Sequence, residues 1–289
     1  MDKIFYLVFC YFVLFSSSVC AQKQKVFDVN GVQLVMVEVE GGEFQMPIES
    51  NTMYLDGTNK HTIETCKVKV DTYMIGQYEV TQELFRAVMG YGVPHEYIAL
   101  ELPDGNSVAF KDAKKLKLGL KYPVQGIPWT ECIAFIAQLN ILTGAKFRLP
   151  TQAEWYYAAC GGKLGSSTKL VDPATIDELG WYKDNSDGIV HEVGQKRANA
   201  LGLYDMLGNV SEWLNDWWNN EGYNTESILD NPKGPETGSY KFFYSADIGT
   251  NFFFGTDTPY PLVFTVPPMP KWRPDQSDKR IGFRIVCDM

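Results

Sequence analysis

The chain has 289 residues, of which 45% are apolar and 21% are charged, as is usual for a folded globular protein. It carries 26 Lys and Arg against 35 Asp and Glu, so its formal net charge is −9. An acidic chain without a basic run is not expected to bind nucleic acid by phosphate neutralisation, nor to be attracted to anionic lipid.

The first 21 residues have the features of a signal peptide. A positively charged start precedes an apolar run at 4–15, which is too short to span a bilayer, and small residues lead to Ala21. We therefore expect cleavage after Ala21 and export to the periplasm or cell envelope. The mature chain, 22–289, is expected to form one domain without a transmembrane segment. Acylation at Cys20, as in a lipoprotein, is the alternative.

Four of the six cysteines remain after this cleavage. In an oxidising compartment one or two disulfides are expected, and the sequence does not choose among the three full pairings. No two of these cysteines form a CxxC metal or redox motif. Cys132, in a predicted helix, and Cys160, at a helix end, can instead be buried thiols. The four are Cys66, Cys132, Cys160 and Cys287.

The first half of the mature chain predicts two strands and three helices. The strands are Val32–Val39, followed by a glycine turn, and 67–75, where polar and apolar residues alternate. Thr81 is expected to cap a helix to Met89 that stops at Gly90, and Thr130 a helix that ends at Gly144. Thr151 and Glu154 form a capping box for a third helix, which Gly161 and Gly162 close.

The second half of the chain shows little periodicity. The stretch 219–280 is rich in Pro, Gly, Asn and aromatic residues, which predicts long ordered loops or a functional surface. Strand character returns at 280–286. A final strand after so long an excursion is expected to pair with distant strands, the first ones in the chain being the favoured partners.

The segment Gly202–Trp213 carries the clearest indication of a site. It is strongly apolar, and its only charges are Asp205 and Glu212. A buried carboxylate is costly unless it is paired or binds a metal, and carboxylate oxygens among glycine-permitted turns suit calcium. The alternative is that Asp205 caps a turn and Glu212 pairs with an arginine.

Other catalytic motifs are missing from the sequence. The three histidines lie in unrelated loops, and there is no HExxH, GxSxG or GxGxxG sequence. Arg148, just before the capping box, can either bind a substrate carboxylate or form a structural ion pair, and the ion pair is favoured.

Five signatures occur in order along the chain: Ile75–Thr81, Tyr122–Trp129, Phe147–Trp155, Gly202–Trp213 and the closing Gly282–Arg284. Together they resemble the formylglycine-generating enzyme family, also called the sulfatase-modifying factor family. The resemblance covers about 32–286.

The resemblance implies an α+β, C-type-lectin-like fold: a twisted antiparallel sheet with a few helices and long ordered loops. It also implies a calcium site in the fourth signature. By position, Asp205 and Glu212 would supply side-chain oxygens, and Gly208 and Val210 backbone carbonyls. The second calcium site of the family is not expected here, because the matching segment near 185–193 is shortened.

This sequence departs from the family at the oxidase site. The family's oxidases use two cysteines, four residues apart and shortly before the last strand, to bind copper(I) and oxidise a substrate cysteine to formylglycine. Between Tyr240 and Arg280 this chain has no cysteine. Copper(I) needs soft thiolate ligands, so no copper and no catalytic residue are expected. The three-histidine set of the family's iron-dependent relatives is also missing.

These observations favour an exported, non-catalytic member that acts as a binding or envelope scaffold module. Its expected partner is an envelope protein or a glycan, with the aromatic stretch Phe252–Trp272 as a candidate contact surface. The alternative is a formylglycine-generating oxidase that acts on sulfatases.

Overall fold

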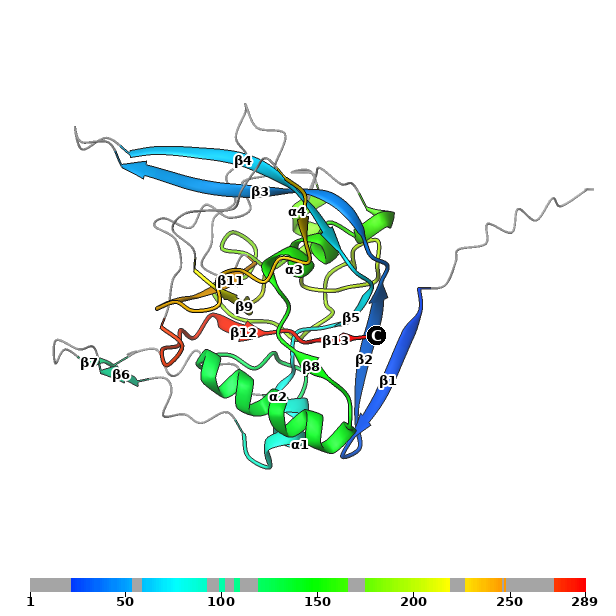
Figure 1. Cartoon of the computed structure of the whole chain (residues 1–289). Helices are drawn as coiled ribbons and strands as arrows, with labels where there is room; N and C mark the ends of the chain where they lie inside the picture. The colour runs from blue at the N-terminus through cyan, green and yellow to red at the C-terminus, as the bar shows by residue number, and fades with distance from the viewer. Residues whose placement is uncertain are drawn as a thin grey trace, which may run out of the picture.

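The computed structural model describes 22–53, 59–92, 99–101, 107–109, 119–165, 175–218, 227–245, 247 and 273–289. The predicted signal segment and the aromatic stretch Phe252–Trp272 lie outside these residues. Figure 1 shows the chain with its elements labelled. In the described part, no helix has both the length and the apolar character needed to cross a bilayer.

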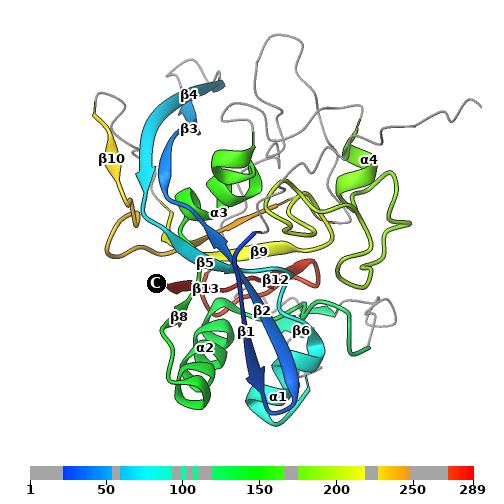
Figure 2. The ribbon, with the colours of Figure 1, turned by 90° about the vertical axis from the view of Figure 1, so that its right-hand side faces the viewer.

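A five-stranded sheet in the order β1-β2-β5-β13-β8 forms the centre of the domain, and all its neighbouring strands are antiparallel. Figure 2 shows that the first strands and the last strand of the chain belong to this one sheet. Its strands are β1 (Gln24–Val29), β2 (Val32–Val39), β5 (Tyr73–Gly76), β13 (Val286–Asp288) and β8 (Phe147–Arg148). The predicted strand Val32–Val39 is therefore confirmed.

The two faces of this sheet pack against different hydrophobic clusters, because side chains alternate along a strand. Val37 and Ile75 belong to the cluster that includes the helix α3 (Gln152–Ala159). Met36 and Met74 belong to the cluster that includes α1 (Gln82–Met89) and α2 (Trp129–Thr143). In Figure 1, α1 and α2 accordingly lie below the sheet and α3 above it.

Three smaller sheets and two short helical segments complete the described fold. The long pair β3 (Gly42–Met53) and β4 (Asn59–Val70) joins β10 (Leu229–Asp230), and β9 (Ser211–Trp217) lies between β11 (Lys241–Tyr244) and β12 (Ile281–Phe283). The hairpin β6 (Ala99–Glu101) and β7 (Ser107–Ala109) stands apart in Figure 1. The helical segments are η3 (Gly162–Leu164) and α4 (Ile176–Leu179). The predicted α+β class, with antiparallel sheets and few helices, is confirmed.

The predicted strand 67–75 is wrong as a single element, because it is divided between two sheets. β4 ends at Val70 and β5 begins at Tyr73. Between them, the Asp71 N–H donates to the side-chain oxygen of Asn231 and the Thr72 hydroxyl accepts from the Gly41 N–H. A Cβ at position 41 would lie 2.6 Å from the Val70 carbonyl oxygen, so this crossing of the chain requires glycine.

The end of the chain also differs from the predicted single strand. Residues 280–286 contribute to two strands in different sheets, because β12 pairs parallel with β9 whereas β13 lies between β5 and β8. The last strand thus joins the sheet of the first strands through β5. Within the stretch predicted as loops, β11 is a strand that the sequence analysis missed, and it pairs with β9 through an irregular register.

The predicted helix boundaries are confirmed except at one N-terminus. Thr81 caps α1, Gly90 and Gly144 end α1 and α2 in the left-handed conformation, and the Thr151–Glu154 capping box starts α3. Thr130, however, does not cap α2. That helix begins at Trp129 after Pro128, whose ring fixes φ near the value that precedes a helix and whose carbonyl accepts the first N–H groups.

The four cysteines that the structure describes are free and buried, so the expected disulfides are not present. Each thiol lies in the core and fills space as a small apolar side chain. Cys66 and Cys160 belong to the α3 cluster, and Cys132 and Cys287 to the α1–α2 cluster.

Candidate functional site

The signature Gly202–Trp213 forms a series of tight turns that lead into β9. Asp205 and Asn209 adopt positive φ angles of 59° and 79°, which short polar side chains tolerate. A Cβ on Gly208 would lie 2.1 Å from the Trp181 carbonyl oxygen, so only glycine fits there. These turns bring Asp205, Asn209 and Glu212 into the interior, where each is at most 1% exposed.

Glu212 is paired with Arg284, and both side chains are completely buried. The guanidinium Nε lies 3.1 Å from each carboxylate oxygen, and Nη2 lies 2.9 Å from Oε1. The indole N–H of Trp155 donates to Oε2 at 2.6 Å. Arg284 also donates to the carbonyls of Gly76 and Tyr204, at 2.8 and 2.7 Å. This pair therefore joins β9, α3 and the terminal strands.

Glu79 is a second buried carboxylate in this interior. It accepts hydrogen bonds from the Asn209 amide, at 2.8 Å, and from the Val210 N–H, at 3.1 Å. Burial raises the pKa of Glu79 well above its ordinary value, and the nearby negative charges of Asp205 and Glu212 raise it further. The single guanidinium of Arg284 thus faces three carboxyl groups.

Asp205 is the one of these carboxyl groups that keeps an unused oxygen. Its Oδ2 accepts from the Gly194 N–H at 2.7 Å, whereas its buried Oδ1 has no hydrogen-bond partner in the described part of the chain. Burial raises the pKa of Asp205 to about 6, against the opposing effect of the Gly194 hydrogen bond. A buried oxygen without a hydrogen-bond partner is costly. Within the signature, Asp205 Oδ1 is therefore the atom best placed to bind an additional ligand.

The four predicted calcium ligands, Asp205, Gly208, Val210 and Glu212, fall on this signature, but the set does not fit a cation as it is arranged. Both Glu212 oxygens accept hydrogen bonds from Arg284 or Trp155. A cation at Glu212 would also meet the guanidinium charge. Only Asp205 offers a free carboxylate oxygen. Among the described residues, no three His, Cys, Asp or Glu side chains are grouped to hold a metal. Calcium at Asp205 stays a prediction.

Two residues of this interior, Glu79 and Arg284, were not assigned a role from the sequence. Each is a single charge inside an apolar run, Tyr78-Glu-Val80 and Phe283-Arg-Ile285, and such a charge signals burial with a partner. The alternative that Glu212 pairs with an arginine is confirmed, and the arginine is Arg284.

The cysteines do not form the copper(I) donor set of the family's oxidases. Burial raises the pKa of the Cys66 thiol to about 11 and that of Cys160 to about 12, and the pKa of Cys132 rises well above its usual value. Copper(I) binds thiolates, and these thiols resist deprotonation in the core. The residues present therefore do not fit the copper centre.

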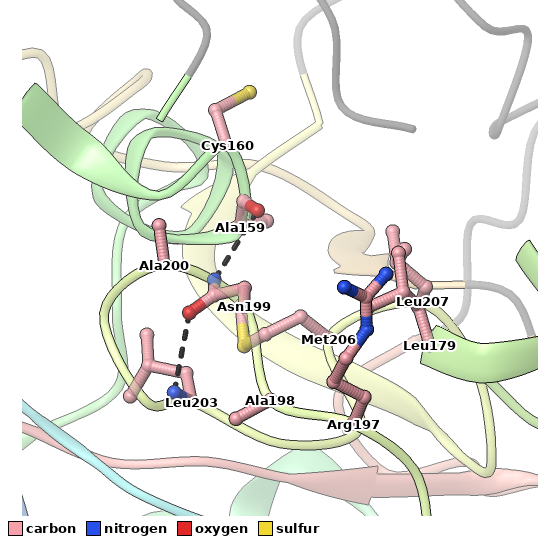
Figure 3. A pocket seen from close by; sticks show the side chains of 10 residues that line it. All are labelled: Ala159, Cys160, Leu179, Arg197, Ala198, Asn199, Ala200, Leu203, Met206 and Leu207. Atoms are coloured by element: carbon pink, nitrogen blue, oxygen red, sulfur yellow. Dashed lines mark hydrogen bonds between the residues drawn. The ribbon is translucent and has the colours of Figure 1, made fainter. Parts of the chain in front are cut away.

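One pocket of about 220 Å³ lies between the end of α3 and the loop 197–207 (Figure 3). The Asn199 amide fastens that loop by donating to Ala159 and accepting from the Leu203 N–H. The Arg197 guanidinium pairs with the exposed Glu178, 3.1 Å away. Apart from Arg197 and Cys160, the described residues that line it are small, apolar or amide side chains. This lining offers no acid–base pair.

Comparison with known proteins places this chain in a family. Residues 23–289 match the family model of the sulfatase-modifying factor enzyme 1-like domain. The chain belongs to this family. The carboxyl groups and the arginine of its buried interior thus come from three of the signatures on which the resemblance rests: the first, the fourth and the last.

Among the relatives of this chain, one is named a chaperone and another an enzyme. "Chaperone protein LppX" of Paenibacillus barcinonensis is 30% identical over 220 residues, which cover 63% of this chain and 71% of that protein. The formylglycine-generating enzyme of Thermomonospora curvata is 30% identical over 183 residues, or 58% of this chain and 56% of the enzyme. The chain thus aligns with little more than half of that enzyme.

Solved structures confirm the expected fold. Treponema denticola variable protein 1 has a TM-score of 0.66 at 24% identity and covers 92% of this chain and 99% of its own. PvdO from Pseudomonas aeruginosa also has a TM-score of 0.66, at 21% identity, and covers 93% and 100%. At these identities the likeness concerns the fold alone.

Proposed function

We propose that this chain is a non-catalytic, exported member of the sulfatase-modifying factor family that acts as a binding or scaffold module of the cell envelope. The observation that carries the proposal is the placement of its cysteines. All four that follow residue 21 are buried and free; three lie on β4, α2 and β13, and Cys160 directly follows α3. No cysteine occurs between Tyr240 and Arg280, where the family's oxidases have their copper ligands.

The fold of the family is retained, which is what a binding module on this scaffold requires. The buried Glu212–Arg284 pair ties the signature to the end of the chain and gives a rigid interior around which loops can vary. The apolar run at 4–15 supports export. The relative named a chaperone protein supports a role in holding a partner, because its aligned part covers 71% of that protein.

The alternative function is a formylglycine-generating oxidase, which the 30% identity to the Thermomonospora curvata enzyme favours. The two functions are separated by loading the mature chain with copper(I) and incubating it in air with a Cys-x-Pro-x-Arg peptide. Mass spectrometry then detects conversion of the thiol to the aldehyde. We expect no conversion, with the Thermomonospora enzyme as the positive control. Conversion above the enzyme-free background would replace our proposal by the oxidase.

The binding role has its own test, an affinity capture from the native envelope fraction. We expect a stable protein or polysaccharide to be retained by the folded chain and not by the heat-unfolded chain. Repeated captures without a specific partner would contradict the scaffold role.

A further inference from the structure

A second pocket, of about 440 Å³, lies where the central sheet meets two smaller sheets. Its size falls within the usual range for small-molecule sites. The wall comes from the β4–β5 turn, from β8 and the start of α3, from β9, from the turn after β10, and from the chain end. The described residues that line it are Val70, Asp71, Thr72, Tyr73, Arg148, Thr151, Glu154, Asn215, Asn231, Lys233 and Asp288.

Arg148 does not offer a free fork to a ligand in this pocket. Its Nη1 and Nη2 donate to the two Glu154 oxygens at 2.7 and 2.6 Å, and its Nε and Nη2 donate to Asp288 at 3.0 and 2.7 Å. The remaining Nη1 hydrogen is directed to the Leu149 carbonyl, 3.2 Å away. The structural ion pair expected for Arg148 is confirmed, and it fixes one wall of the pocket.

Two other polar side chains on the wall have unused donors. The Asn215 amide and the Lys233 ammonium make no hydrogen bond or ion pair with the described residues. One oxygen of Asp71, Oδ1, and one of Asp288, Oδ2, also accept nothing from the described residues, whereas their partner oxygens are bonded to Asn231 and Arg148. The pocket therefore presents unused donors and unused acceptors on a wall that other bonds hold in place.

The charges of the wall select against an ionic ligand. An anion would approach the carboxylates of Asp71, Glu154 and Asp288, and a cation would approach Arg148 and Lys233. A hydroxyl group both donates and accepts, so it can satisfy a free carboxylate oxygen and a free ammonium or amide without introducing charge. Several hydroxyl groups on one small neutral molecule match this mixed wall best.

Two tryptophans, Trp217 on β9 and Trp129 on α2, are connected to the pocket through Lys241. Their ring centroids are 6.2 Å apart. The Lys241 ammonium lies 3.7 Å from the Trp217 ring and 4.1 Å from that of Trp129, and it donates to the Asn215 carbonyl at 2.7 Å. Both indoles are half-buried, and such rings can cover the C–H face of a sugar ring.

We propose that this pocket, defined by Asn215, Lys233, Asp71 and Asp288, binds a neutral carbohydrate. The proposal rests on the proposed binding role and names the ligand class and the site. The Asn215 amide and Lys233 bind sugar oxygens, and the two aspartates accept from sugar hydroxyls. A longer glycan extends toward Trp217.

The test is saturation-transfer NMR with the mature chain and a panel of neutral probes: glucose, galactose, mannose and chitotriose. Glucuronic acid and glucosamine serve as the charged comparators. We expect saturable binding of at least one neutral probe, weakened about tenfold by Asn215→Ala and by Lys233→Ala, as expected for the loss of one good hydrogen bond. Lys183→Ala, at an exposed lysine outside the pocket, is the matched control and leaves binding unchanged.

Thermal melting of each variant shows that it is folded, and Lys233→Glu is a second variant that adds a carboxylate without touching the core. No binding of any neutral probe, preferred binding of a charged comparator, or unchanged binding by the Asn215→Ala/Lys233→Ala double variant would each overturn the carbohydrate site. If the site fails while the chain retains a protein from the envelope fraction and leaves the copper assay peptide unconverted, the proposed function stands without it.

Discussion

Arg284 and Glu212 form a completely buried ion pair between residues that are 72 positions apart, with the guanidinium Nη2 2.9 Å from the carboxylate Oε1. The pair connects the fourth signature of the chain to its terminal strands. Burial raises the pKa of both Glu79 and Asp205. The negative charge of Asp205 raises the pKa of Glu79 further, and that of Glu212 raises the pKa of both. The interior therefore depends on Arg284 for its only positive charge among these four groups.

Glu212→Gln should destabilise the fold strongly, because it leaves a buried guanidinium without its counter-charge. We expect a loss of about 3–5 kcal/mol in the free energy of unfolding, measured by denaturant titration. Glu38→Gln, at the more exposed Lys23–Glu38 pair, is the control and should cost less than about 1 kcal/mol. The double variant Glu212→Leu/Arg284→Met should recover part of the loss. Equal losses of unfolding free energy in Glu212→Gln and Glu38→Gln would show that the buried pair contributes no more to stability than the exposed pair.

Asp205→Asn tests the predicted calcium site without breaking the Arg284 pair. If calcium binds at the free Oδ1 of Asp205, EDTA should lower the melting temperature of the wild type and calcium should restore it. The variant should lose this response, and Asp187→Asn, at an exposed aspartate, should keep it. A wild-type melting temperature that is the same in EDTA and in calcium would leave Asp205 with its hydrogen bond to Gly194 alone.

Lys241 should make stability depend on pH in the alkaline range. Burial lowers the pKa of this lysine to about 8, whereas in the unfolded chain it is about 10.4. Between these values the unfolded chain holds a proton that the folded chain has released, so the contribution of Lys241 to the unfolding free energy rises from pH 8 to about pH 10. The difference in unfolding free energy between the wild type and Lys241→Met, followed over this range, measures the effect. A difference that stays flat, or falls, contradicts the lowered pKa.

The four cysteines should be unreactive in the folded chain. Ellman's reagent attacks thiolates, and burial raises the pKa of Cys66 to about 11 and of Cys160 to about 12. We expect no rapid reaction at pH 8 under native conditions and four reactive thiols per mature chain in denaturant without reductant. Only two or no thiols after denaturation would show that the exported protein forms the disulfides that the structure lacks.

The sequence predicts those parts of the fold that depend on near neighbours. Thr81, Gly144 and the Thr151–Glu154 capping box act within three or four residues of their own position, and the structure has them as expected. The family resemblance supplied the detailed fold, whereas the apolar composition of Gly202–Trp213 itself predicted that Glu212 is a buried carboxylate.

Contacts between distant segments decide the parts that the sequence did not predict. β4 and β5 are separate strands, and between them the Asp71 N–H donates to the side-chain oxygen of Asn231, which is 160 positions away in the sequence. Arg284 follows β12 directly, and it meets Glu212 because β12 pairs with β9, a contact between segments about 70 positions apart. The hydrophobic periodicity of a single sequence does not show which distant residues pair. A single charged residue between apolar neighbours therefore predicts that the residue is buried, but not which residue it pairs with.

The most direct test of the central claim, that this scaffold lacks the thiolate pair of the family's oxidases, is a copper(I) competition titration. The reduced mature chain is titrated against a chromophoric copper(I) chelator, with the Thermomonospora curvata enzyme in parallel, and free thiols are counted at each step. We predict that this chain withdraws no copper from the chelator and keeps its four buried thiols, while the enzyme binds the metal. One tightly bound copper per chain, with two thiols protected, would contradict the account.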